Sequence, residues 1–308
     1  MVVKEVKLSV DVAGIQMKNP VMTASGTFGF GEVYEDFFSN ELLGAMVVKG
    51  VTLKARKGNS APRLVETPAG LINSIGLENP GVKVVQRELL PSLKKYDVPV
   101  IVNISGNIVE EYGELAGLLS SSSVVKGLEV NISCPNVKEG GMAFGSSPEM
   151  AAKVIREVKK STNLPVIAKL SPNVTNVVEI ALAVEEAGAD AISLINTLLG
   201  MVIDIKRKKP VLGNIMGGLS GPAVRPVAVR MVWQVAQRVK VPVIGMGGIS
   251  TAEDALQFIM AGATAVAIGT GQFVNPCCCV DVIKGLEDFC RKNGIKNIND
   301  LRGVAWNE

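Results

Sequence analysis

The chain contains no histidine, and this absence excludes several kinds of active site. A Ser-His-Asp triad, a Cys-His dyad and a zinc ion held by histidine all need an imidazole, so none of them can be built within this chain. Any proton transfer must use the side chain of an Asp, Glu, Lys, Tyr or Cys residue, or a hydroxyl group.

Charge of one sign, long apolar runs and spaced cysteines are also lacking. Lys and Arg total 32 against 29 Asp and Glu in 308 residues, which is too balanced to indicate nucleic acid or an anionic membrane surface as a partner. No run of 18 apolar residues occurs, and the opening MVVKEVKLSV lacks the pattern of a signal peptide. The five cysteines, three of them adjacent, do not form a disulfide framework. We therefore expect a soluble, cytoplasmic protein with reduced cysteines.

Eight apolar runs alternate with helix-like segments or long loops, a pattern typical of βα units and a parallel sheet. The runs begin at Val21, Gly44, Val98, Gly127, Pro165, Ala191, Pro242 and Ala265. A hairpin-like stretch, VKLSVDVAGIQMKNP, precedes them. The count predicts a (β/α)8 TIM barrel in a single α/β domain over residues 1–308, with a doubly wound open sheet as the alternative.

Two helices carry recognisable start signals. One is predicted to begin at Ser147 as its N-cap, with Pro148 in the first helical position. The other is predicted to begin with a capping box of Ser250 and Glu253 and to end at Gly262.

Two connections, Val51 to Pro80 and Leu198 to Pro222, are too long for plain turns. Both follow the C-terminal end of a predicted strand, the face of a barrel where active sites lie. Long loops in a compact domain are usually functional or disordered, so we expect them to contribute to a site.

Polar or glycine residues stand at the ends of all eight predicted strands. They are Ser25, Lys49, Asn103, Asn131, Cys134, Lys169, Asn196, Thr197, Gly247, Gly248, Gly269 and Thr270. Each one alone is compatible with ordinary strand termination, but together they predict a cup lined with hydrogen-bonding groups. The glycines after the last two strands expose backbone N–H groups where barrels of this kind often bind phosphate. Because a Walker A pattern is absent and GMGG matches a dinucleotide fingerprint only in part, a phosphate-bearing cofactor in the barrel mouth is favoured over a Rossmann site.

Two lysines and one cysteine at the strand ends need a chemical explanation. Burial of an unpaired ammonium group is costly, so Lys49 and Lys169 are each expected to meet an anion or an electron-rich cofactor. A Schiff-base lysine, as in barrel aldolases, is the rival hypothesis. For Cys134, both a small buried apolar side chain and a catalytic thiol remain open at this point.

Seven motifs in the chain resemble those of class 1 dihydroorotate dehydrogenases, and the resemblance is strongest to the NAD-linked type. The motifs are VMTASGTFGFG, VVKGVTLKARKGN, ETPAGLINSIGLENPG, NISCPNVKEGG, LINTLLGM, GGLSGPAVRP and GMGGISTAEDA. The resemblance covers the chain from about Val6 to beyond Asn275.

The resemblance implies an FMN enzyme that oxidises dihydroorotate to orotate, with Cys134 as the base. It implies that FMN is bound by Ser25, Lys49, Gly50, Asn103, Asn131, Lys169, Ile195, Gly221, Gly247, Gly248, Gly269 and Thr270. It implies that the substrate contacts Lys49, Asn73, Ser74, Ile75, Gly76, Leu77, Asn131, Asn196 and Thr197. The loop over residues 137–147, which has three glycines, is expected to act as a lid.

The same resemblance implies a partner. Electrons would pass to NAD⁺ through a second subunit that carries FAD and a [2Fe–2S] cluster, in a heterotetramer of two chains of each kind built on a homodimer of this chain. The nearest alternatives are the same fold acting on another dihydropyrimidine or using fumarate as acceptor. More distant alternatives are a cofactor-free barrel aldolase or lyase that uses Lys169 or Lys49, and a noncatalytic subunit that keeps only the flavin.

The adjacent Cys277, Cys278 and Cys279 depart from the pattern expected of this family. Packing of small apolar side chains at the start of the last helix is the favoured interpretation. An iron–sulfur site is disfavoured because successive residues do not easily converge on one tetrahedral centre and the CxxC spacing is missing. Sensitivity to oxidation is a third possibility.

We expect the Cys134→Ala variant to bind FMN but to reduce it about 10²–10⁴-fold more slowly with dihydroorotate, the usual contribution of a general base. Cys134→Ser should keep some activity at high pH, because a hydroxyl loses its proton much less readily than a thiol and can act as the base only once it is deprotonated. Stopped-flow bleaching of the flavin band measures both rates. Near-normal reduction by the alanine variant at neutral pH would remove Cys134 from the mechanism.

Overall fold

Eight parallel strands form the centre of the molecule in the computed structural model, which describes residues 5–133 and 144–306. They are β3 (Val21–Thr23), β4 (Met46–Val51), β7 (Val100–Ile104), β8 (Val125–Asn131), β9 (Val166–Lys169), β10 (Ala191–Leu194), β15 (Val243–Met246) and β16 (Ala265–Ile268). Each overlaps one of the eight predicted apolar runs, although β8 begins two residues before the predicted start at Gly127 and β4 extends one residue past the predicted end at Gly50. Their order in the sheet, β3-β16-β15-β10-β9-β8-β7-β4, pairs every strand with its neighbours along this series.

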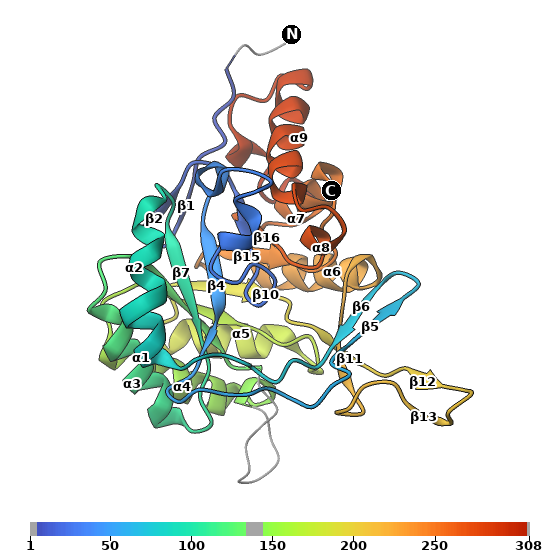
Figure 1. The fold of residues 1–308 in the computed structure, drawn as a ribbon. Helices are drawn as coiled ribbons and strands as arrows, with labels where there is room; N and C mark the ends of the chain where they lie inside the picture. Colours follow the sequence, from blue (N-terminus) through green and yellow to red (C-terminus); the bar gives the residue numbers. More distant parts are fainter. Residues whose placement is uncertain (1–4, 134–143, 307–308) are drawn as a thin grey trace.

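The sheet closes on itself between β3 and β4. Met22 and Ala45 form a parallel bridge, and the Gly44 N–H donates to the Val21 carbonyl at 2.8 Å. A Cβ on Gly44 would lie 2.0 Å from the Asn19 carbonyl oxygen, so only glycine allows this approach. The (β/α)8 barrel is therefore confirmed, and the open doubly wound sheet is wrong (Figure 1).

Helices surround the barrel and bury their apolar sides against it (Figure 1). They are α3 (Val109–Ser120), α4 (Pro148–Ser161), α5 (Val177–Glu186), α6 (Arg225–Ala236), α7 (Ala252–Met260), α8 (Gly271–Val274) and α9 (Cys278–Lys292). Between β4 and β7, α1 (Val82–Val84) and α2 (Leu90–Ser92) are joined by a π-helical stretch, Val85–Leu89. Because both faces of the sheet are covered, its strands are almost uninterrupted runs of Val, Ile, Leu and Ala.

The predicted helix starts agree with the structure in one case and not in the other. Ser147 caps α4, and its side chain accepts a hydrogen bond from the Met150 N–H. At α7 the predicted box of Ser250 and Glu253 is wrong by one residue, because Thr251 is the N-cap and Asp254 is its partner. Both pairs fit the same spacing rule, and the chain selects the pair whose acidic side chain is buried. Gly262 follows the helix with a φ of 114°, as its predicted stop requires.

A short hairpin closes the N-terminal end of the barrel. β1 (Val10–Val12) pairs with β2 (Ile15–Met17), as the opening stretch of the sequence predicts. The Ile15 side chain lies so close to Gly127 that a Cβ there would be 2.8 Å from its Cδ1. This end is therefore packed with apolar side chains, which leaves the opposite end of the barrel for a site.

At the C-terminal end, the two long connections pair with each other. They form a four-stranded antiparallel sheet in the order β11-β14-β6-β5. Its strands are β5 (Leu64–Thr67), β6 (Gly70–Asn73), β11 (Leu198–Gly200) and β14 (Gly217–Ser220). A further hairpin, β12 (Ile203–Asp204) with β13 (Lys209–Pro210), projects from it (Figure 1). The sequence predicted functional loops here, and the structure resolves them as an ordered wall beside the barrel mouth.

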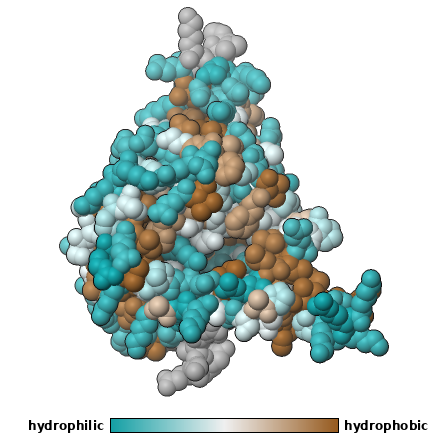
Figure 2. Space-filling view, in the orientation of Figure 1, coloured by the Kyte–Doolittle hydropathy of each residue, from teal (hydrophilic) through white to brown (hydrophobic). Residues whose placement is uncertain are grey.

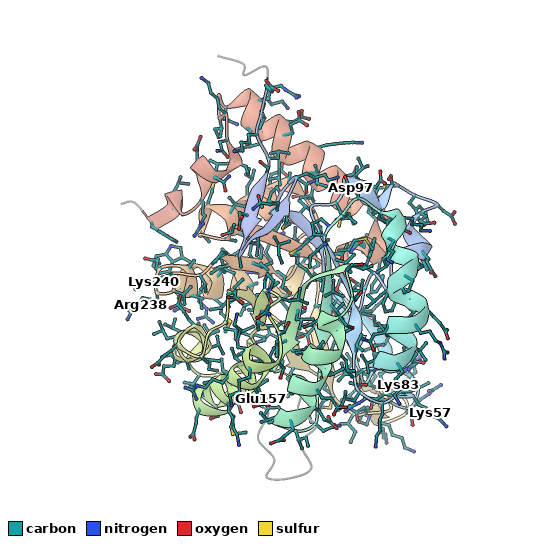
Figure 3. All side chains as sticks on the ribbon, turned by 90° about the vertical axis from the view of Figure 1, so that its left-hand side faces the viewer. Lys57, Lys83, Asp97, Glu157, Arg238 and Lys240 are labelled. Atoms are coloured by element: carbon teal, nitrogen blue, oxygen red, sulfur yellow. The ribbon has the colours of Figure 1, made fainter. Side chains whose placement is uncertain are left out.

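Part of the exposed surface of this wall is apolar. Exposed apolar side chains of the wall and its hairpin include Leu64, Leu199, Met201, Ile203 and Ile205, and Figure 2 shows apolar residues over this region. Charged residues labelled in Figure 3, among them Lys57, Asp97 and Lys240, lie at the periphery of the molecule. Within residues 5–133 and 144–306, no helix is long and apolar enough to cross a membrane.

The cap of α7 can be tested with two neighbouring residues. The Thr251 hydroxyl accepts from the Asp254 N–H at 3.3 Å, so Thr251→Ala should lower the free energy of unfolding by about 1 kcal/mol. Ser250 uses only its backbone groups, with its N–H donating to Asp254 and its carbonyl accepting from Cys278, so Ser250→Ala is the matched control and should change little. Chemical denaturation measures both. A larger effect for Ser250 than for Thr251 would contradict the assigned cap.

Candidate functional site

The residues at the ends of the parallel strands meet at one edge of the barrel, because all eight strands run in the same direction. Ser25 follows β3, Lys49 and Gly50 lie in β4, Asn103 in β7, Asn131 in β8 and Lys169 in β9. Ile195, Asn196 and Thr197 follow β10, Gly247 and Gly248 follow β15, and Gly269 and Thr270 follow β16. The structure thus brings together at the mouth the strand-end residues that it describes.

Cross-strand register then decides which of these residues are direct neighbours. Asn103 of β7 pairs with Glu129 of β8, while Lys169 of β9 pairs with Asn131 on one side and with Ser193 of β10 on the other. The pairing of β4 with β7 shifts register between Val48 and Val51, which places an irregularity at Lys49 and Gly50. Such irregularities are common at barrel rims, where they redirect side chains.

Lys169 is held inside the mouth by two groups. It is 5% exposed, and its ammonium donates to the Ser25 hydroxyl at 3.1 Å and to a Glu129 carboxylate oxygen at 3.4 Å. Lys169 was expected to meet an anion, and Glu129 is that anion. Glu129 was not among the predicted site residues, although a single acidic residue inside the apolar run Leu128–Ile132 is a sequence signal that could have found it.

Asn131 is fixed from both its backbone and its side chain. Its carbonyl accepts from the hydroxyl of Tyr112, which is fully buried on α3. Its side-chain oxygen accepts from the Ser133 N–H at 3.2 Å and from the Asn196 amide at 3.3 Å. The side-chain oxygen of Asn196 accepts in turn from the Thr197 N–H at 2.8 Å. The two predicted amides therefore act as one connected pair at the mouth.

The antiparallel wall places two more predicted residues around Gly218. The Asn73 amide donates to the Gly218 carbonyl at 3.3 Å, and Gly218 pairs with Asn73 in the sheet. A Cβ on Gly218 would lie 1.9 Å from the Thr197 hydroxyl oxygen. Close packing at this glycine thus brings together side chains from the two long connections.

The segment Ser74–Leu77 is anchored by Asn59, which ends the motif VVKGVTLKARKGN but was not among the predicted site residues. The Asn59 amide donates to the carbonyl of Ser74 at 3.1 Å and to its hydroxyl at 3.0 Å. The Asn59 N–H donates to the Ile75 carbonyl, and a Cβ on Gly76 would lie 2.7 Å from Asn59. Leu77 reaches the strand end of β4, since its Cδ2 would lie 3.6 Å from a Cβ on Gly50.

On the other side of the mouth, glycines let backbones approach each other closely. Gly248 has a φ of 76°, and a Cβ there would lie 2.7 Å from the Gly221 carbonyl oxygen. A Cβ on Gly221 would in turn lie 2.8 Å from the Gly70 Cα. The Thr270 hydroxyl donates to the Ser220 hydroxyl at 2.6 Å, so Ser220 is a further hydroxyl at this edge that the sequence did not indicate.

Gly269 differs from these glycines because the protein itself does not require it. The nearest atom to a Cβ built there is 3.4 Å away, which is an ordinary contact, and its φ is not in the left-handed region. Open space beside a glycine at a strand end suits a ligand that approaches the backbone closely, as a phosphate group does.

Two of the three adjacent cysteines pack in the core, as the favoured interpretation predicts. Cys278 and Cys279 are 1% and 0% exposed, and Cys277 is half-buried. Burial, together with the nearby Asp281 and Asp254, raises the pKa of the Cys278 thiol to about 11. Burial also raises the pKa of Cys279 well above its usual value. In the described part of the chain, no group of three or more His, Cys, Asp or Glu side chains is arranged to hold a metal ion.

Two predicted features fall outside the described residues. Cys134, the predicted base, is one of them, and so is the greater part of the predicted lid, residues 137–143.

Comparison with known proteins agrees with this architecture. The family model described as dihydroorotate dehydrogenase matches residues 7–290. The chain belongs to the dihydroorotate dehydrogenase family. Its curated relatives in this family include proteins named dihydroorotate dehydrogenase B (NAD(+)), catalytic subunit.

Three of these dihydroorotate dehydrogenases are similar to the chain over nearly their whole length. The protein of Desulforudis audaxviator (strain MP104C) is 60% identical, with 98% of each chain covered. The protein of Desulforamulus reducens is 58% identical, with 98% of this chain and 99% of the relative covered. That of Geotalea uraniireducens (strain Rf4) is 56% identical, with 96% of this chain and 97% of the relative covered.

Proposed function

We propose that this chain is the catalytic subunit of an NAD-linked dihydroorotate dehydrogenase, which oxidises (S)-dihydroorotate to orotate in the de novo synthesis of UMP. Its relatives with this printed name are similar to it along almost the whole chain. The observation that carries the proposal is the mouth of the barrel, where the fixed ammonium of Lys169 lies among the amides of Asn103, Asn131 and Asn196. Such a set suits a flavin and a small ring with amide and imide edges.

FMN fits the two halves of this mouth. We infer that its phosphate is held at Gly247, Gly248, Gly269 and Thr270, where Gly269 leaves open space beside the backbone, and that Gly221 packs against the cofactor. We infer that its ring lies against Ser25, Lys49, Gly50, Asn103, Asn131, Lys169 and Ile195. When bound, FMN would accept the hydride that leaves C6 of dihydroorotate.

The substrate is proposed to lie between the barrel and the antiparallel wall. Lys49 is half-buried at the end of β4, and its ammonium has no hydrogen-bond or ion-pair partner among the described residues. It would bind the substrate carboxylate. The amides of Asn73, Asn131 and Asn196 would hold the ring edges without adding charge, and Ser74, Ile75, Gly76, Leu77 and Thr197 would complete the contact surface.

Cys134 is proposed as the base that takes the proton from C5. Without histidine in the chain, a thiol at the mouth is a suitable group, provided that its surroundings favour the thiolate. The residue before it is anchored there, because the Ser133 N–H donates to Asn131 and its hydroxyl donates to the Lys169 carbonyl at 3.4 Å.

The alternatives are less well supported. A Schiff-base aldolase would need a neutral lysine, but Lys169 forms an ion pair with Glu129, and the family assignment gives no support to a lyase. Oxidation of another dihydropyrimidine, or transfer of electrons to fumarate, would use the same fold, but the names of the relatives favour dihydroorotate and NAD⁺.

We also propose that electrons reach NAD⁺ through a second subunit with FAD and a [2Fe–2S] cluster, in a heterotetramer of two chains of each kind. The phrase "catalytic subunit" in the relatives' names supports the proposal that a second subunit exists. The sequence contains no G-x-G-x-x-G after a strand with an acidic residue about 20 positions on, so a separate nicotinamide-binding unit is needed. Its five cysteines lack the spacing of a [2Fe–2S] site.

The test is to purify this chain alone, load it with FMN, and compare two electron acceptors with dihydroorotate as donor. We expect rapid reduction of an artificial dye and negligible reduction of NAD⁺, because the dye can collect electrons directly from the flavin. Addition of the FAD- and iron–sulfur-containing subunit should restore NAD⁺ reduction. Brisk NAD⁺ reduction by the lone chain would contradict the two-subunit proposal, and failure with both acceptors would contradict the activity itself.

A further inference from the structure

Glu129 is a carboxylate inside the barrel whose only role described so far is its ion pair with Lys169. It lies in β8 and is 2% exposed, between Leu128 and Val130, which are fully buried. Its partners lie on β7, β9 and β10, so its side chain faces the interior of the barrel and not the surrounding helices. A charge in this position is expensive unless it is paired and fully hydrogen-bonded.

Both oxygens of the Glu129 carboxylate have partners. Oε1 accepts from the Ser193 hydroxyl at 2.8 Å. Oε2 accepts from the Asn103 amide at 2.7 Å and from the Lys169 ammonium at 3.4 Å. One carboxylate therefore fixes two of the residues that are proposed to contact the flavin ring.

The Asn103 amide can adopt only one orientation in this arrangement. A carboxylate accepts hydrogen bonds, so the Asn103 NH₂ group has to face Glu129. Its oxygen then faces Gly50, where a Cβ would lie 2.9 Å from it. Glu129 thus decides that Asn103 presents an acceptor, and not a donor, toward the strand end of β4.

Lys169 is fixed in a similar way. Its ammonium has three N–H donors, and in the described part of the chain Ser25 and Glu129 take two of them. The third remains for a ligand. Because the ammonium is bound from β3 on one side and β8 on the other, its position does not depend on that ligand.

We propose that Glu129 is a positioning residue for the flavin: it orients Lys169 and Asn103 before FMN binds, and its negative charge offsets that of Lys169 beside the ring. The proposal rests on the proposed function, since it concerns the same cofactor. It extends that function with a residue that touches neither flavin nor substrate and acts through the two that do. A carboxylate that served only the packing of the barrel would influence stability but not the properties of the bound flavin.

Two substitutions separate orientation from charge. Glu129→Leu removes every hydrogen bond, so the Kd of the apoprotein for FMN, measured by quenching of flavin fluorescence, should rise at least tenfold. Glu129→Gln can still accept from Asn103 and Lys169 and donate to Ser193, so its Kd should stay within about threefold of the wild type. In this variant the charge of Lys169 is no longer offset, so reduced flavin is favoured and the reduction potential of the bound FMN should become more positive.

Thr23→Val is the matched control for loss of a buried polar contact. Thr23 is 0% exposed inside the same barrel, but its hydroxyl bonds only to the backbone of Val47, with distances of 2.9 and 3.2 Å. We expect this variant to lose thermal stability while keeping the Kd for FMN and the potential of the wild type.

Three results would overturn the proposal. They are an unchanged Kd in a folded Glu129→Leu variant, an equal loss of affinity in Thr23→Val, and a wild-type potential in Glu129→Gln. The last measurement keeps the proposal testable if Glu129→Leu does not fold. If the wild-type chain binds no FMN, the proposed function fails, whereas tight binding that is indifferent to Glu129 overturns this inference alone.

Discussion

The register of the parallel strands decides which polar side chains meet inside the barrel. Hydrogen bonding in register places Asn103 beside Glu129, and Lys169 between Asn131 and Ser193, although these residues come from four separate strands. A shift of one residue in any strand would turn its interior side chains toward the helices. The closure of the barrel between β3 and β4 then places Ser25 within reach of Lys169, which completes the polar interior.

The buried polar residues of this interior stabilise the protein only while each keeps its partner. The Lys169–Glu129 pair is buried, with side-chain exposures of 6% and 3%, so removing one partner is expected to cost about 3–5 kcal/mol. An apolar interior could be equally stable, as is common for buried ion pairs. We therefore interpret the retained charges as serving a cofactor rather than the fold. At the opposite end of the barrel, the Ile15 side chain packs closely against Gly127. The barrel thus has one end packed with apolar side chains and one polar end, the mouth.

Much of the fold could be predicted from the sequence because the signals are local. The eight apolar runs and the cap at Ser147 depend on residues close in sequence, and all of them were found. The cap of α7 was displaced by one residue because two acceptor–acid pairs fit the same spacing, and only burial of Asp254 distinguishes them. The antiparallel wall could not be predicted, because β14 pairs with β6 across about 145 residues and its strands are short and rich in glycine.

In the candidate site, too, the residues with a local sequence signal were predicted, and those whose roles depend on distant partners were not. Strand-end polar residues such as Lys49 and Asn196 were recognised from their positions, and the family resemblance extended the set to the Asn73–Leu77 segment. Glu129 and Asn59 were missed because their roles depend on partners in other elements. The sequence around Glu129 gives only a weak sign of its role, and the sequence around Asn59 gives no sign that it anchors another segment. The adjacent cysteines were interpreted correctly as packing for Cys278 and Cys279, since small apolar side chains suit the buried start of α9.

The barrel mouth is proposed to bind FMN and to use it to oxidise dihydroorotate. The most direct test is an anaerobic titration of the FMN-loaded chain with dihydroorotate and, separately, with dihydrouracil, which lacks the carboxylate proposed to bind Lys49. We expect stoichiometric bleaching of the flavin band by dihydroorotate and almost none by dihydrouracil at the same concentration. Equal bleaching by the two compounds, or no bleaching by dihydroorotate, would contradict it.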